Sequence, residues 1–168
     1  MINLKRVCII AMLLAMAIVL NILESFIPML IPGVKLGLAN IIVLIMLYEF
    51  RASEAFLVDL LRIVIATLAR GTFLSPTFLM ALSGGMISFF VMYLFSRLKF
   101  FSPIGVSVLG AVSHAVGQIL IAIILLKTSA VIYYLPWIAS LSIVTGILSG
   151  ILVRIYLKRS ITHRFIKD

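Results

Sequence analysis

Six apolar runs divide the chain nearly from end to end, and they limit its possible folds more than any other feature of the sequence. A helix needs roughly 20 apolar residues to cross the hydrocarbon core of a bilayer. The second run is short and the others approach or exceed that length; the runs cover residues 7–31, 36–50, 52–69, 76–95, 104–126 and 131–157. With 64% hydrophobic residues, the chain has too little polar surface to coat a soluble globule. We therefore expect an all-α membrane protein, a six-transmembrane-helix bundle that forms one domain over residues 1–168.

The positions of the lysines and arginines predict how this bundle is oriented. If both termini are cytoplasmic, three basic residues lie outside, namely Lys35, Arg70 and Lys127. Ten lie inside, which are Lys5, Arg6, Arg51, Arg97, Lys99, Arg154, Lys158, Arg159, Arg164 and Lys167. Because cytoplasmic loops carry the excess of basic residues, this bias predicts cytoplasmic termini. The net charge of +9 then reflects topology, and we expect no nucleic-acid partner because the basic residues mark the ends of the runs.

The loop between the first two runs concentrates residues that are uncommon beside a membrane span. Pro32 and Gly33 end the first helix, and Lys35 is the lone cation of the loop. Gly37 and Asn40 begin the next run with backbone that can approach a ligand or another helix closely. Polar groups at such a place usually serve a function. On the predicted topology, this loop faces the exterior.

Polar and aromatic residues at the predicted outer ends of the runs are candidates for a ligand pocket. The cations outnumber the one carboxylate, and arginine binds phosphate or carboxylate through paired hydrogen bonds. An aromatic ring adds a surface for a flat or apolar group. We therefore predict a small anionic or strongly polar ligand with a flat or apolar part. The candidate substrate-binding residues are Asn21, Glu24, Lys35, Asn40, Arg70, Gln118 and Trp137, with Tyr133 and Tyr134 at the level of Trp137. The alternative is that they are interfacial anchors that never converge.

Charged residues within the third run need partners inside the membrane. Asp59 and Arg62 lie three residues apart on one helical face, so we predict a structural ion pair, with a proton relay as the alternative. His114 in the fifth run shares a face with Gln118, and we interpret it as a hydrogen-bonded bundle residue. No second histidine or cysteine stands at ligand spacing, and Cys8 is the single cysteine. We expect no metal site and no cofactor.

Two alanines near the start of the first run lie four residues apart. Ala11 and Ala15 share a face, and small residues at this spacing let another helix approach closely. They are candidates for docking a partner protein. The alternative is ordinary packing within the chain.

Three short motifs together point to a known family. They are Pro32-Gly33-Val34-Lys35-Leu36-Gly37-Leu38-Ala39-Asn40, Gly71-Thr72-Phe73 and Leu82-Ser83-Gly84-Gly85. The chain resembles, over nearly its whole length, the Gx transporter family, often labelled heptaprenyl diphosphate synthase component I. That family is similar to the substrate-binding S components of energy-coupling factor (ECF) transporters, which are six-helix membrane proteins with both termini inside. The resemblance implies a multi-pass protein of a prokaryotic cytoplasmic membrane.

The resemblance also implies partners. In S components, an alanine motif in the first helix contacts a transmembrane coupling subunit, and Ala11 and Ala15 match its spacing and location. The loop between the first two helices helps to close the substrate site, which is where Lys35 stands. The chain has no Gly-x-x-x-x-Gly-Lys phosphate loop, so the resemblance implies that energy comes from cytoplasmic ATPases.

Prenyl diphosphate synthases hold magnesium and diphosphate with aspartate-rich motifs, and this chain has only the distant Asp59 and Asp168. We therefore expect no catalytic residues and no enzyme activity of its own. The leading hypothesis is an S-component-like subunit of an ECF-type uptake transporter, capturing an anionic or vitamin-like molecule from outside. The alternative is a noncatalytic accessory subunit of heptaprenyl diphosphate synthase in isoprenoid or menaquinone synthesis. A third hypothesis, a small ion channel, would need a polar stripe that continues to the cytoplasmic face.

Overall fold

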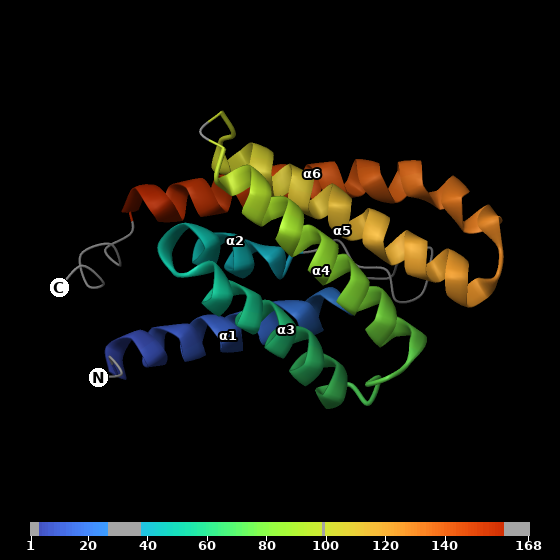
Figure 1. Cartoon of the computed structure of the whole chain (residues 1–168), viewed down its shortest axis with the longest axis horizontal. Coiled ribbons are helices and arrows are strands. Elements are labelled where there is room, and N and C mark those ends of the chain that lie inside the picture. The colour runs from blue at the N-terminus through green and yellow to red at the C-terminus, as the bar shows by residue number, and fades with distance from the viewer. Residues whose placement is uncertain (1–3, 27–37, 99, 160–168) are drawn as a thin grey trace.

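The computed structural model describes residues 4–26, 38–98 and 100–159, and in these ranges the chain is helical with no strand. Figure 1 shows the helices as a bundle of long, roughly aligned rods around a shorter one. The elements are α1 (Leu4–Glu24), α2 (Asn40–Glu49), α3 (Ala52–Ala69), α4 (Pro76–Ser96), α5 (Pro103–Leu126), the 3-10 helix η1 (Ser129–Tyr134) and α6 (Leu135–Arg159).

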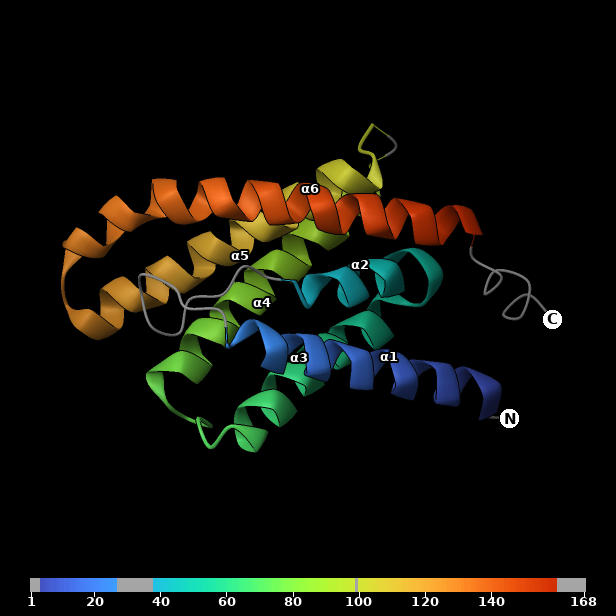
Figure 2. The same cartoon turned by 180° about the vertical axis from the view of Figure 1, so that it is seen from behind.

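The start of α1 and the end of α6 lie at the same end of the bundle, which we call the termini end (Figures 1 and 2). Two polar contacts join helices there. Arg6 of α1 forms an ion pair with Glu54 in the first turn of α3, at 2.7 Å. The hydroxyl of Tyr156 in α6 donates to Oε2 of Glu49, the last residue of α2, at 3.1 Å. We call the opposite end, where α1 and α3 finish, the far end. The assignment of the termini end to the cytoplasm stays a prediction.

The shortest α-helix, α2, lies at the centre of the bundle, where it contacts α1, α3, α4, α5 and α6. Seven of its residues are buried, namely Asn40, Ile42, Val43, Leu44, Ile45, Met46 and Leu47. A helix that is apolar on all sides must be surrounded by protein or lipid, and here the other helices supply most of the cover. The central position of α2 places its first residue, Asn40, inside the bundle.

Small residues allow α4, α5 and α6 to pack closely along one another. A Cβ atom on Gly117 of α5 would lie 2.9 Å from the Cα of Gly84 in α4, which is closer than a side chain can come. On the other side of α5, a Cβ on Gly146 of α6 would lie 2.8 Å from the Cα of Val108. In a membrane the hydrophobic effect does not drive helices together, because lipid tails are as apolar as the side chains. Helices there associate through close packing of this kind.

Local sequence signals explain where several helices begin and end. Ser75 caps α4 by accepting a hydrogen bond from the backbone of Phe78, and Pro76 occupies the first helical position, where its missing N–H costs nothing. The same Ser-Pro arrangement, Ser102 and Pro103, begins α5. After α3, Gly71 adopts a left-handed conformation with φ of 67°, which suits glycine at a helix end.

The helices follow the six predicted apolar runs in order, but α1 ends at Glu24, before Pro32 and Gly33, where the sequence predicts its end. The helices also differ in their capacity to cross a membrane. Four are long and apolar enough, namely α1, α4, α5 and the continuous segment of η1 with α6. The 18-residue α3 carries three charged side chains, Glu54, Asp59 and Arg62, and α2 has only 10 residues. The described chain is therefore an all-helical protein with four candidate membrane-spanning helices, and six spans with cytoplasmic termini remain a prediction.

Candidate functional site

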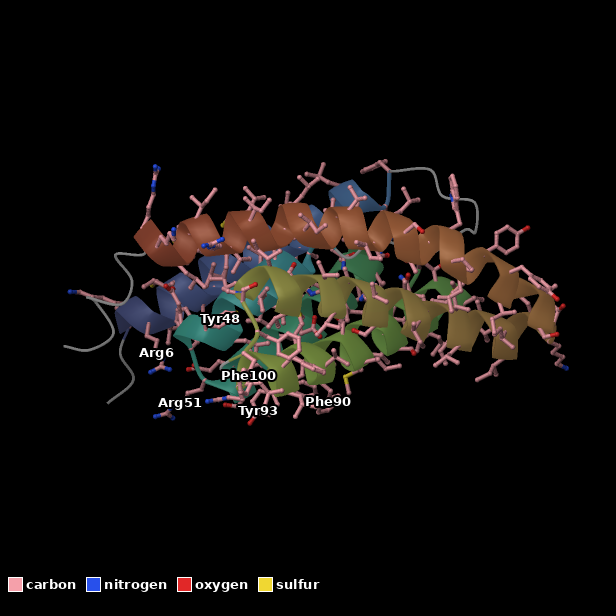
Figure 3. All side chains as sticks on the ribbon, turned by 90° about the horizontal axis from the view of Figure 1, so that it is seen from above. Arg6, Tyr48, Arg51, Phe90, Tyr93 and Phe100 are labelled. Atoms are coloured by element: carbon pink, nitrogen blue, oxygen red, sulfur yellow. The ribbon has the colours of Figure 1, made fainter. Side chains whose placement is uncertain are left out.

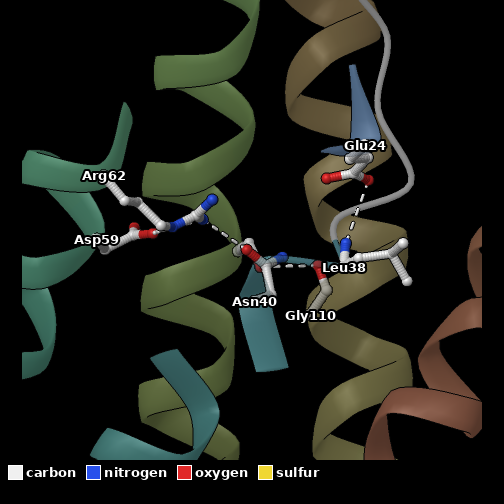
Figure 4. Close-up of polar contacts among 7 residues, drawn as sticks. Glu24, Leu38, Asn40, Asp59, Arg62 and Gly110 are labelled. Atoms are coloured by element: carbon white, nitrogen blue, oxygen red, sulfur yellow. Dashed lines mark hydrogen bonds and ion pairs between the residues drawn. The ribbon is translucent and has the colours of Figure 1, made fainter. Parts of the chain in front are cut away.

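A connected group of buried polar side chains crosses the middle of the bundle (Figure 4). Arg62 of α3 lies 2.6 Å from Oδ1 of Asp59 in an ion pair, and its Nη2 donates to Oδ1 of Asn40 at 2.7 Å. Asn40 in turn donates through Nδ2 to Oγ of Ser88 in α4 at 2.9 Å, and the Ser88 hydroxyl donates to the carbonyl of Gly110 in α5 at 2.8 Å. All four side chains are at most 6% exposed. We call Asp59, Arg62, Asn40 and Ser88 the central network.

The central network lies well inside the bundle. It includes Asn40, the first residue of α2, and α2 is only half as long as a membrane span. Ten residues rise about 15 Å, compared with a hydrocarbon core of about 30 Å. The partners of Asn40 agree with this depth, since Arg62, Ser88 and Gly110 all lie well away from the ends of their helices. The first turn of α2, with backbone N–H groups that have no partner within the helix, therefore begins beside a buried ion pair.

A second polar group lies toward the far end, at the last turns of α1 and α3. Asn21 and Glu24 of α1 are 2% and 3% exposed. Oε1 of Glu24 accepts a hydrogen bond from the backbone N–H of Leu38 at 3.1 Å, which ties the end of α1 to the residues that lead into α2 (Figure 4). Glu24 is also close enough to act on Arg70, the residue that ends α3. Burial lowers the pKa of the Arg70 guanidinium, and the negative charge of Glu24 opposes that shift.

The Arg70 side chain is only partly satisfied by the protein. Its Nε donates to the carbonyl of Ala66 at 2.9 Å, while its Nη2 is buried and has no hydrogen-bond partner among the described residues. A buried guanidinium nitrogen without an acceptor is unfavourable, because no hydrogen bond within the protein offsets the free energy lost when the nitrogen is removed from water. The donor would be satisfied by an acceptor from a phosphate or carboxylate.

His114 and Gln118 of α5 face α4 across its two glycines. Both side chains are buried, at 3% and 0% exposed. A Cβ on Gly84 would lie 2.9 Å from Cγ of Gln118 and 3.1 Å from Cε1 of His114, so the absence of a side chain at Gly84 makes room for them. On the adjacent face of α4, a Cβ on Gly85 would lie 2.6 Å from Cδ1 of Ile63 and 3.5 Å from Oδ2 of Asp59. The glycine pair thus lets polar residues of α3 and α5 approach α4 from two sides.

The structure does not bring all the predicted site residues together. Asn21, Glu24 and Arg70 gather at the far end, whereas the amide of Asn40 is occupied by Arg62 and Ser88 in the central network. Trp137 is 60% exposed on the surface of α6, as an interfacial anchor would be. The predicted site residue Lys35 lies outside the described residues, as do Pro32, Gly33 and Gly37 of its loop.

The two alanines of α1 face away from the bundle. Ala11 and Ala15 are exposed, whereas Leu13 and Ala17, on another face, are buried. Within the described chain, the packing alternative considered for these alanines therefore has little support. They lie on a surface that either lipid or another protein must cover.

The sequence alone did not identify Ser88 as a site residue. It bridges α2 to α5, and a detectable signal exists, because Ser88 lies four residues after Gly84 on the same face of α4. The bond from the Leu38 backbone to Glu24 has no comparable signal, because any residue except proline offers the same donor. No group of three or more His, Cys, Asp or Glu residues within the described ranges is placed to share a metal ion.

Comparison with known proteins gives a family match. The model of the family described as heptaprenyl diphosphate synthase component I matches residues 13–156. These residues include every described helix except the first turns of α1 and the last residues of α6. No match was found among curated proteins or among solved structures.

Proposed function

Because this chain belongs to the heptaprenyl diphosphate synthase component I family, we propose that it serves as a membrane-embedded substrate-binding subunit, similar to an S component of an ECF-type transporter. In this role it captures a small anionic or vitamin-like molecule from the outer side of a prokaryotic cytoplasmic membrane. A transmembrane coupling subunit and cytoplasmic ATPases supply the energy.

The observation that carries this proposal is the half-length helix α2. Transport sites often form where a short or broken helix begins inside the membrane, because its first N–H groups and nearby polar side chains can replace the water around a polar solute. Here α2 begins at Asn40, beside the buried ion pair of Asp59 and Arg62.

The far-end residues give the proposal its ligand chemistry. Arg70 has a buried donor, Nη2, that no described acceptor meets, and Glu24 and Asn21 are buried nearby. An anionic group bound at Arg70 would receive a hydrogen bond from that donor and a favourable charge interaction. Gln118 lies deeper, against Gly84, where it can meet an uncharged part of the same ligand. In this proposal Lys35 provides a second cation from the loop between α1 and α2.

The outward-facing alanines supply the proposed docking surface. Ala11 lies in the half of α1 nearer the termini end and Ala15 near the middle of the helix, on one exposed face that a partner subunit could contact. Small residues allow a partner helix to approach the backbone of α1 closely. The alternative function, a noncatalytic accessory subunit of heptaprenyl diphosphate synthase, is favoured by the wording of the family description and would use the same surface to dock a soluble synthase.

Copurification from native membranes separates these functions. Wild-type protein should retain a coupling subunit and ATPases, identified by mass spectrometry, and Ala11→Trp should lose them while remaining monodisperse and helical. Met16→Trp is the matched control, because Met16 is also exposed on α1, at 53%, but lies on a different face from the alanines. Recovery of a prenyl synthase instead would support the accessory function. Recovery of neither kind of partner, or full recovery with Ala11→Trp, would contradict the docking surface.

A further inference from the structure

An apolar groove opens between α3 and α4 at the termini end, away from the site proposed above. It has a volume of about 240 Å³ and is lined by Ala52, Ser53, Phe56, Phe89, Phe90 and Tyr93. We call it the α3–α4 groove. The rings of Phe56 and Phe89 meet edge to face with centroids 5.1 Å apart, and the rings of Phe89 and Tyr93 are parallel at 6.3 Å. Three aromatic residues of one helix and one of its neighbour thus make a continuous apolar wall.

The dimensions and chemistry of the α3–α4 groove suit a single hydrocarbon chain. Pockets that enclose a whole cofactor or drug-sized molecule usually exceed about 300 Å³ and contain several polar groups. This groove is smaller, and its polar side chains, Ser53 and Tyr93, lie near the start of α3 and the end of α4, at the termini end. Phe56 lies three residues further along α3 than Ser53, and Phe89 lies four residues from Tyr93 along α4, so the two rings are about one turn, or roughly 4.5–6 Å, deeper. The groove therefore has its polar side chains at one end and its apolar rings at the other, as the headgroup and acyl chain of a lipid require.

Two arginines flank the shallow end of the groove. The guanidinium of Arg97 lies over the Tyr93 ring, 5.3 Å from its centroid. Arg51 immediately precedes Ala52 in the chain, and Figure 3 shows Arg51 and Tyr93 toward the same end of the bundle. Both residues are exposed. The carboxylate of Glu54 accepts from the Arg51 backbone N–H at 3.0 Å and forms an ion pair with Arg6 at 2.7 Å, while Glu49, two residues before Arg51, accepts from the Tyr156 hydroxyl. The charges of Arg6 and Arg51 both act on the Glu54 carboxylate. With Arg97, the three arginines still leave an excess of positive charge at this end of the groove, which can attract an anion.

From this combination we propose that the α3–α4 groove binds one anionic phospholipid of the surrounding bilayer. One acyl chain lies against Phe56, Phe89 and Phe90, and the phosphate lies between Arg51 and Arg97, with the Ser53 hydroxyl as an additional donor. Basic residues beside grooves between membrane helices recognise anionic headgroups in this way. The lipid would join the start of α3 to the end of α4. This inference is independent of the ligand that the far end takes.

Lipid titration of the purified full-length protein tests the proposal. The probes are phosphatidylglycerol and phosphatidylcholine with identical acyl chains, and native mass spectrometry measures the bound lipid. The double variant Arg51→Gln with Arg97→Gln should lose affinity for phosphatidylglycerol by at least about tenfold, since each removes a charged hydrogen bond to phosphate. Its matched control is Arg154→Gln with Arg159→Gln, which removes the same charge from exposed positions of α6 at the same end. The control should bind as wild type does.

A second variant tests the acyl-chain part of the site without altering charge. Ser53 is exposed at the groove, so Ser53→Trp should fill the groove while the helices remain folded, as circular dichroism would verify. It should lose phosphatidylglycerol binding although both arginines remain. Unchanged binding in either test variant, or equal affinity of the wild type for the two lipids, would overturn the proposal. So would a photo-crosslinker at Tyr93 that captures a polypeptide rather than lipid in native membranes.

Discussion

Replacing Arg62 with leucine tests how the central network stabilises the protein. Arg62 donates from Nε to Oδ1 of Asp59 at 2.8 Å and from Nη2 to Oδ1 of Asn40 at 2.7 Å. The other carboxylate oxygen of Asp59 has no hydrogen-bond partner among the described residues. Arg62→Leu would therefore leave a carboxylate that is 1% exposed without any compensating donor.

The expected losses of unfolding free energy depend on which buried polar groups each substitution leaves without a partner. Removing one member of a buried ion pair typically costs about 3–5 kcal/mol, because the remaining charge is uncompensated. In the double variant Asp59→Leu with Arg62→Leu, no charge is left behind. The remaining defect is Oδ1 of Asn40, whose loss of a donor costs about 1–3 kcal/mol, while Nδ2 keeps its bond to Ser88. The double variant should thus be about 2 kcal/mol more stable than Arg62→Leu.

The assay is equilibrium unfolding in mixed micelles, with dodecyl sulfate as the denaturant and far-ultraviolet circular dichroism as the signal. Wild type, both single variants and the double variant form a complete mutant cycle, which isolates the coupling between Asp59 and Arg62. The order of stability should be wild type, then the double variant, then Arg62→Leu. If the double variant is no more stable than Arg62→Leu, the ion pair between Asp59 and Arg62 is not what offsets the cost of burying these two charges.

Two other predictions concern the ligand and the packing. In a thermal-shift screen of anionic and vitamin-like molecules, the true ligand should raise the melting temperature of the wild-type protein. Lys35→Ala and Arg70→Ala should each abolish this shift. Unchanged ligand affinity in both variants would rule out the site. Gly117→Ala should destabilise the protein by about 1–3 kcal/mol, because its Cβ would lie 2.9 Å from the backbone of Gly84. Gly105→Ala is the control in the same helix, because the atom nearest to its added Cβ would be 3.5 Å away. This variant should be as stable as the wild type or more stable by up to about 1 kcal/mol. Equal effects of the two substitutions in the same unfolding assay would contradict the close contact between α4 and α5.

The sequence alone determined the helical architecture and the family. Apolar runs bounded by Pro, Gly and Ser placed most helix ends within a few residues, and the 52–69 run coincides with α3. These features are local, since capping and the limits of an apolar run depend on neighbours along the chain. The contact between Asp59 and Arg62 is local in the same sense, because three residues along a helix bring side chains to one face. The family match over residues 13–156 confirms the resemblance that the three motifs indicate.

Only the tertiary structure decided which polar groups meet across helices. Asn40 was placed among the ligand-pocket residues from sequence, yet its amide joins Arg62 to Ser88, which are 22 and 48 residues away along the chain. The outward direction of Ala11 and Ala15 likewise depends on which face of α1 packs against the bundle. Periodicity shows which residues share a face, but when nearly every side chain is apolar it does not show which face is covered. That choice is made by the fit of small residues such as Gly84 and Gly117 between helices, and this fit exists only in three dimensions.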